Sequence, residues 1–106
     1  LPEAEAAAAP PGAFHVVMTH SHALDLEIVA AALAARPGFV GLIGSATKRA
    51  TFLRKLRARG LSEPSLSALT CPIGLPGLRD KRPAVIAAGV AAQLLTLDAA
   101  RAVRAA

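Results

Sequence analysis

The sequence has few of the residues that form disulfide bonds or large aromatic cores in small domains. It has one cysteine, no tryptophan, no tyrosine and three phenylalanines among 106 residues. The single Cys71 excludes an internal disulfide and a cysteine-rich zinc module, and it is consistent with a reducing, cytoplasmic setting. Because hydrophobic residues still reach 54%, a core can form from Leu, Ile, Val and the three Phe. The composition predicts one domain with helices packed closely on a sheet.

Signals for export or membrane insertion are also scarce. We find no run of 18 uninterrupted apolar residues, which is about the length that a membrane-spanning helix requires. The N-terminal stretch "LPEAEAAAAPPGA" carries acidic residues where a signal peptide carries basic ones. We therefore expect a soluble cytoplasmic protein that does not bind a membrane.

The net charge of +5 comes mainly from two segments, "KRATFLRKLRARG" at residues 48–60 and "RDKR" at residues 79–82. Proteins that bind single-stranded nucleic acid stack bases on aromatic side chains between the basic ones, and here only Phe52 could serve. We expect no nucleic-acid partner. Solvated helix faces account for most of these charges, and a small anionic ligand is the alternative.

The order of apolar runs predicts an α/β fold. Residues 1–13 are rich in Ala and Pro and are expected to form a disordered linker, so that the folded domain spans residues 14–106. Strands alternating with helices favour parallel pairing with right-handed crossovers. The predicted strands lie within residues 14–20, 39–44 and 66–74, and the predicted helices within residues 23–36, 46–60 and 83–106.

Polar or conformationally special residues follow each predicted strand. They are the segments 19–22 (Thr-His-Ser-His), 44–45 (Gly-Ser) and 71–74 (Cys-Pro-Ile-Gly). In an open parallel sheet the carboxyl ends of the strands share one edge, where ligands bind. The sequence therefore predicts a ligand site that draws on these three segments.

The helix predicted after residue 45 begins with the wrong charges. If Ser45 is the N-cap, Lys48 and Arg49 lie near the positive end of the helix dipole, at a cost of ~0.3 to 1 kcal/mol each. A bound anion would make the two cations favourable at this position. The anion could contact the backbone N–H groups, the Thr47 hydroxyl and both cations, and Gly44 would let it approach the backbone closely. The two long side chains could also turn into water, and the segment lacks the Gly-Lys-Ser/Thr ending of a P-loop.

Histidine and cysteine indicate no recognisable metal or catalytic set. His20 and His22 have no third ligand at a typical spacing, so a metal site is disfavoured. His20 could line the ligand crevice as a donor or acid–base group, or it or Ser21 could cap the following helix. Cys71 at a strand end is more often a small buried hydrophobe than a reactive thiol.

Three blocks together resemble a known family. "VVMTHSHALDLEIVAAAL", "FVGLIGSATKRATFLRKLRARG" and "LTCPIGLPG", followed by Pro83, Ile86 and Ala87, resemble the C-terminal domain of the XdhC/CoxI family, the xanthine dehydrogenase accessory factors. The resemblance covers roughly residues 14–95. It implies a Rossmann-like three-layer domain with a short parallel sheet, in a cytoplasmic chaperone rather than an enzyme.

The resemblance also implies a cofactor and a partner. Similar proteins bind the molybdenum cofactor (molybdopterin) and deliver it to a molybdenum hydroxylase such as xanthine dehydrogenase. The residues that would receive the pterin phosphate are Gly44, Ser45, Thr47, Lys48 and Arg49, with His20 and Cys71 lining the same crevice.

The chain departs from the family pattern in several places, and two of them bear on ligand binding. Ser21-His22 stands where the family usually has Asp-Pro, and the first β-α-β part with its Gly-x-Gly turn does not occur in these residues. NAD binding is therefore not expected. A short sheet with an unpaired edge predicts association, for example as a homo-oligomer. A fragment of an NAD(P)-binding oxidoreductase and a non-catalytic dimerisation module stay open as alternatives.

Overall fold

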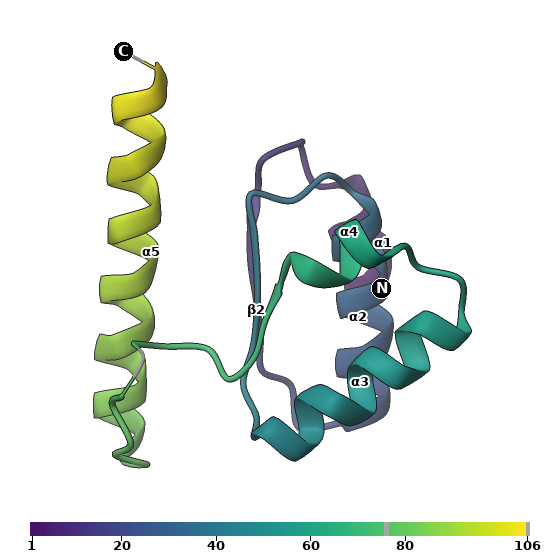
Figure 1. The fold of residues 1–106 in the computed structure, drawn as a ribbon, viewed down its shortest axis with the longest axis horizontal. Helices are drawn as coiled ribbons and strands as arrows, with labels where there is room; N and C mark the ends of the chain where they lie inside the picture. The colour runs from purple at the N-terminus through teal and green to yellow at the C-terminus, as the bar shows by residue number, and fades with distance from the viewer. Residues whose placement is uncertain (76, 106) are drawn as a thin grey trace. The chain divides into compact units, whose positions relative to one another are not determined.

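The computed structural model describes residues 1–75 and 77–105 (Figure 1). The chain divides into two compact units, one formed by residues 1–72 and the other by the residues from Ile73 onward. The single folded domain expected over residues 14–106 is thus divided between Pro72 and Ile73. Each unit is described below by itself.

The first unit is built on a three-stranded parallel sheet. Its strand order is β1-β2-β3, and the row Val16, Gly41, Thr70 crosses it in register. The strands are β1 (Phe14–Val17), β2 (Phe39–Leu42) and β3 (Leu69–Thr70). Together with the intervening helices they confirm the predicted α/β class with a short parallel sheet.

Three further helices of this unit each begin after a serine, two of them after a strand and the third just before β3. The helices are α2 (His22–Ala34), α3 (Ala46–Ala58) and α4 (Glu63–Ser67). The hydroxyl oxygens of Ser21, Ser45 and Ser62 each accept a hydrogen bond from the backbone N–H three residues later, which satisfies a donor that the helix cannot pair internally. The prediction that Ser45 caps a helix is confirmed, and Ser21 is the residue that caps α2.

The core of this unit lies between the sheet and its helices. Val29, Val40, Leu42 and Leu56 are fully buried, and the Phe52 ring is 3% exposed. Val40 and Leu42 alternate along β2 and so point to one face of the sheet, while Phe52 and Leu56 lie one turn apart on α3. The aliphatic core expected from the composition therefore forms around β2.

The N-terminal segment differs from the prediction. Residues 1–13 were expected to form a disordered linker, but α1 spans Pro2–Ala8 and packs on α2 with Ala6 buried. Pro2 at the start and Glu3 and Glu5 in the first turn favour a helix. Alanine has the highest helix propensity and permits close approach, so a segment that looks like low-complexity sequence can still pack.

The second unit consists of a loop and the helix α5 (Pro83–Ala105), which begins at Pro83 as predicted. The backbone N–H of Gly74 donates a 2.8 Å hydrogen bond to the Gln93 side chain. Gly89 lets the loop approach, because a Cβ there would lie 3.1 Å from the Leu78 side chain.

The helix α5 is long and apolar enough to cross a membrane by length and composition, with a mean hydropathy of 1.5 over its most apolar window and 11% of that window buried. Counting uninterrupted apolar residues missed this property because Gln93 and Thr96 interrupt the run. Core helices of soluble proteins and membrane-spanning helices both pass the same test.

Candidate functional site

A buried ion pair joins the beginnings of α2 and α3. The Lys48 Nζ atom lies 3.2 Å from the Asp25 Oδ2 atom and donates a second hydrogen bond, of 2.9 Å, to the carbonyl oxygen of Ile43. The other carboxylate oxygen of Asp25 accepts a 2.9 Å hydrogen bond from the Thr19 backbone N–H. One carboxylate therefore ties together the loop after β1, the helix α2 and the first turn of α3.

The surroundings of Asp25 keep it ionised. Its side chain is fully buried, and burial by itself raises the pKa of a carboxyl group. The hydrogen bonds from Thr19, and the hydrogen bond and charge of Lys48, outweigh that effect, so the pKa of Asp25 lies below its ordinary value. The Lys48 side chain is 12% exposed, and its ammonium nitrogen lies 5.4 Å from the centre of the Phe52 ring, where a cation–π attraction adds to the pair.

Lys48 therefore has a different role from the one predicted. The sequence suggested a free cation for a ligand at the start of α3, but the structure uses that charge to neutralise Asp25. The sequence analysis did not pair Lys48 with Asp25. Two sequence features together could have indicated the pair. One is an acidic residue among the apolar positions of the first predicted helix, and the other is a lysine in the first turn of the next predicted helix.

Gly44 serves the same ion pair. A Cβ atom at this position would lie 2.5 Å from Lys48 Cδ and 3.2 Å from Lys48 Cγ. The missing side chain thus leaves room for the Lys48 chain to cross toward Asp25. The sequence analysis predicted the close approach of an anion at Gly44, whereas the structure shows the Lys48 side chain there.

Arg49 faces a different part of the molecule from Lys48. It lines a small pocket of about 230 Å³ between α3 and α4, together with Leu53, Leu66 and the exposed Arg57–Glu63 ion pair. The Arg49 guanidinium has no ion-pair partner among the described residues. Consecutive residues on a helix point about 100° apart, so the two cations at this helix start do not form one cluster.

Cys71 lies beside the start of α3. Its Sγ atom is 3.8 Å from the Ser45 carbonyl oxygen, a distance at which the thiol donates a weak hydrogen bond. Burial raises the pKa of Cys71, although the nearby charges of Lys48 and Arg49 act in the opposite direction. The carboxyl edge of the sheet thus brings together Cys71 and Ser45, as the parallel topology predicted. The raised pKa keeps Cys71 protonated as a thiol at neutral pH.

His20 is exposed in the loop after β1 and makes no hydrogen bond or ion pair with the described residues. It lines none of the described pockets. Among residues 1–75 and 77–105, no group of three His, Cys, Asp or Glu side chains could hold a metal ion.

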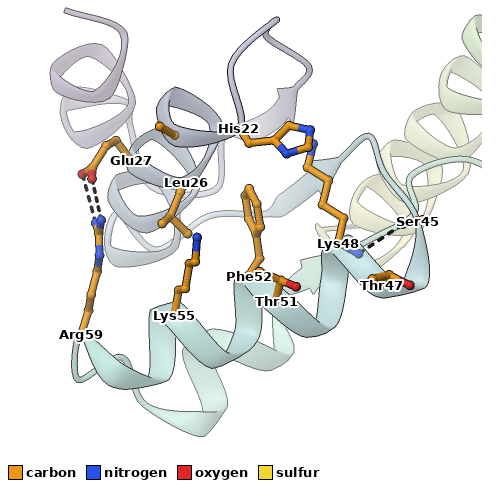
Figure 2. Close-up of a pocket in the computed structure, with 11 residues that line it drawn as sticks. His22, Leu26, Glu27, Ser45, Thr47, Lys48, Thr51, Phe52, Lys55 and Arg59 are labelled. Atoms are coloured by element: carbon orange, nitrogen blue, oxygen red, sulfur yellow. Dashed lines mark hydrogen bonds and ion pairs between the residues drawn. The ribbon is translucent and has the colours of Figure 1, made fainter.

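A larger pocket of about 610 Å³ lies between α2 and α3 (Figure 2). Of the residues predicted for the ligand site, Ser45, Thr47 and Lys48 line it. Gly44, Arg49, His20 and Cys71 do not. Another lining residue, His22, belongs to the predicted segment 19–22. The lining residues that the sequence reasoning missed are Ala23, Leu26, Glu27, Thr51, Phe52, Lys55 and Arg59.

The sequence of the chain was compared with protein families and with curated proteins. No curated protein matches the chain. The family model described as the XdhC Rossmann domain matches residues 1–94, so the match includes α1 and extends 13 residues upstream of the region in which the sequence motifs showed the resemblance. Because this match covers most of the 106 residues, the chain belongs to the XdhC Rossmann-domain family, a family of accessory factors rather than of catalysts.

Proposed function

We propose that the protein is an accessory factor that binds the molybdenum cofactor and delivers it to a molybdenum hydroxylase such as xanthine dehydrogenase. Family membership supports the general role. The observation that supports the proposal is the start of α3 at the carboxyl edge of the sheet, where Thr47 and Arg49 are exposed and the Cys71 thiol lies 3.8 Å from the Ser45 carbonyl oxygen.

The start of α3 has unused hydrogen-bond donors. Ser45 accepts from the backbone N–H groups of Lys48 and Arg49, at its hydroxyl and its carbonyl oxygen respectively. The N–H groups of Ala46 and Thr47 precede these bonds and have no partner within the helix. A phosphate group fits this set of donors, because free N–H groups and the helix dipole both favour an anion.

Two side chains would complete the phosphate site. Both are exposed in the first turn of α3 and would approach the phosphate from different sides, the Thr47 hydroxyl from the side of α2 and the Arg49 guanidinium from the side of α4. Arginine matches phosphate oxygens with two parallel hydrogen bonds, which a lysine cannot do. We therefore assign the main cationic contact to Arg49 and not to Lys48.

Lys48 has a positioning role in this proposal. By bonding Asp25 and the Ile43 carbonyl oxygen, it fixes the loop between β2 and α3 on which the site depends. Such bracing holds the donors in place before the ligand arrives, which reduces the ordering cost of binding.

The cofactor is cargo in this account, so no catalytic residue is assigned. Cys71 would contact the cofactor as a neutral thiol from the neighbouring strand end, and His20 could approach from the exposed loop after β1. The molybdenum cofactor itself supplies the redox chemistry of the hydroxylase that receives it.

Association and location belong to the same proposal. Within the described residues β1 pairs with β2 alone among the strands, so the outer edge of β1 has no neighbouring strand. We propose that a second copy covers this edge to give a homo-oligomer, in the cytoplasm, where Cys71 would stay reduced.

The test measures equilibrium binding of molybdenum cofactor released from a molybdoenzyme, followed by the fluorescence of its oxidised pterin. Arg49→Ala should weaken binding about 10-fold, the loss expected for one charge-assisted contact. Arg54→Ala removes the same charge from the same helix outside the described pockets, and it should bind like the wild type. Equal affinities of the two variants would place the site elsewhere.

A parallel titration with NADH separates the alternatives. Binding of NADH without binding of molybdenum cofactor would favour the oxidoreductase fragment. Binding of neither ligand would favour the dimerisation module.

A further inference from the structure

The side of α3 that faces α2 carries three cations, and only two of them have a carboxylate partner. Lys48, Lys55 and Arg59 recur at helical spacing, so they lie on one face. Lys48 pairs with Asp25, and Arg59 pairs with Glu27 through two hydrogen bonds of 2.6 and 3.0 Å. Lys55, between them, has no carboxylate partner among the described residues.

The two ion pairs mark the ends of the pocket between α2 and α3. Figure 2 shows the Glu27–Arg59 pair at one end and Lys48 near the other, with Phe52 and Lys55 between them. Leu26 and Phe52, which are 8% and 3% exposed, form the apolar part of the lining together with Ala23. We call this space the α2–α3 groove; it is the pocket of about 610 Å³ described above.

The charge of the groove is unbalanced. Glu27 cancels Arg59 and Asp25 cancels Lys48, which leaves the Lys55 ammonium as the uncompensated charge of the lining. The hydroxyl groups of Thr47 and Thr51 add neutral donors on the same wall. Pockets that hold small molecules combine an apolar surface with a few convergent polar groups, and a cleft of one sign attracts the opposite charge.

We propose that the α2–α3 groove binds a small molecule that carries one anionic group on a flat apolar body, with the anion at Lys55 and the apolar body over Leu26 and Phe52. A volume of about 610 Å³ is in the range of pockets for such ligands.

This position is separate from the phosphate position proposed at the start of α3. Thr47 and Lys55 are eight residues apart on α3, which corresponds to about 12 Å along a helix. A single phosphate cannot contact both ends. The inference therefore goes beyond the proposed function, and it does not depend on Arg49.

Phenyl phosphate is a suitable probe, and binding to the full chain can be followed through the amide resonances in NMR. We expect saturable shifts at Thr51, Phe52 and Lys55. Inorganic phosphate, which lacks the ring, should bind at least about 5-fold more weakly in the groove, because the apolar contacts are lost. Equal affinity for both probes, or phenyl phosphate shifts confined to residues outside the groove, would overturn the proposal.

Matched variants test the cation. Lys55→Gln should weaken phenyl phosphate binding about 5- to 10-fold, while Lys55→Arg should stay within about 3-fold of the wild type. Arg54→Gln removes the same charge one residue earlier, about 100° around the helix, and should have little effect. Both sites are exposed, and the amide spectra report whether each of the three variants is folded. Equal weakening by Lys55→Gln and Arg54→Gln would show general charge attraction and contradict a built site.

The two proposals can fail independently. Arg49→Ala should leave phenyl phosphate binding in the groove unchanged. Lys55→Gln tests the groove whether or not the chain binds molybdenum cofactor.

Discussion

The ammonium group of Lys48 lies 3.2 Å from the fully buried carboxylate of Asp25, 23 residues earlier in the chain. This contact explains why a helix begins with a lysine where an acidic residue would suit the dipole. The lysine crosses to the neighbouring helix, and the proposed ligand site is left to the backbone, Thr47 and Arg49.

Removing the lysine charge should destabilise the protein strongly. Lys48→Met leaves the Asp25 carboxylate buried without its cation, which typically costs about 3–5 kcal/mol. Urea unfolding followed by circular dichroism measures the change. Lys55→Met removes an exposed, unpaired lysine from the same helix and should change the free energy of unfolding by less than about 0.5 kcal/mol. Similar values for the two variants would mean that the ion pair is not important for stability.

The stability of the protein should fall in acid partly through Asp25. Its native pKa lies below the ordinary value of 3.8, because the bonds from Thr19 and Lys48 outweigh burial. The unfolded state therefore binds more protons in the acid range, so this stabilisation is present above pH 3.8 and is lost as the pH falls through the native pKa.

Urea unfolding between about pH 2 and pH 6 measures this dependence. The double variant Asp25→Asn/Lys48→Met should show a shallower fall, while exposed carboxylates such as Glu27 contribute equally to both proteins. Identical pH profiles would exclude the proposed contribution of Asp25.

Replacing Gly44 should act through Lys48. The added Cβ of Gly44→Ala would meet Lys48 Cδ at 2.5 Å, so the lysine must move away from Asp25. We expect a loss of about 1–3 kcal/mol, as for other overpacked sites. In a Lys48→Ala background the Cγ and Cδ atoms are absent, and the same change should cost much less. A double-mutant cycle measures this coupling, and additive effects would disprove it.

The thiol of Cys71 should react slowly with alkylating agents at neutral pH. Burial raises its pKa, so the reactive thiolate is scarce. Arg49→Ala should slow the reaction further, because it removes a nearby cation that lowers the pKa. Iodoacetamide labelling followed by mass spectrometry across a pH series measures both effects. Rapid labelling near neutral pH would contradict the buried thiol.

Local patterns were sufficient to predict much of the fold. The β-branched runs around Val16 and Val40, the cap at Ser45 and the start of α5 at Pro83 depend on neighbours in sequence, and the structure confirms them. Parallel topology also predicted that Cys71 would meet the residues after β2, because strand ends share an edge.

The parts that could not be predicted depend on distant contacts or on ambiguous composition. The Lys48–Asp25 pair joins two helices, so no local pattern contains it. The separation of Lys48 from Arg49 follows from the 100° step of a helix and could have been recognised from the sequence. The α1 helix was missed because alanine-rich sequence is typical both of linkers and of helices that pack closely.

The central claim is that this protein holds molybdenum cofactor and passes it to a hydroxylase. The most direct measurement is to load the full chain with the cofactor, mix it with cofactor-free xanthine dehydrogenase, and follow the recovery of hydroxylase activity. We predict greater recovery than the same amount of free cofactor gives, and a reduced recovery with Arg49→Ala but not with Arg54→Ala. Recovery no greater than with free cofactor would contradict the account.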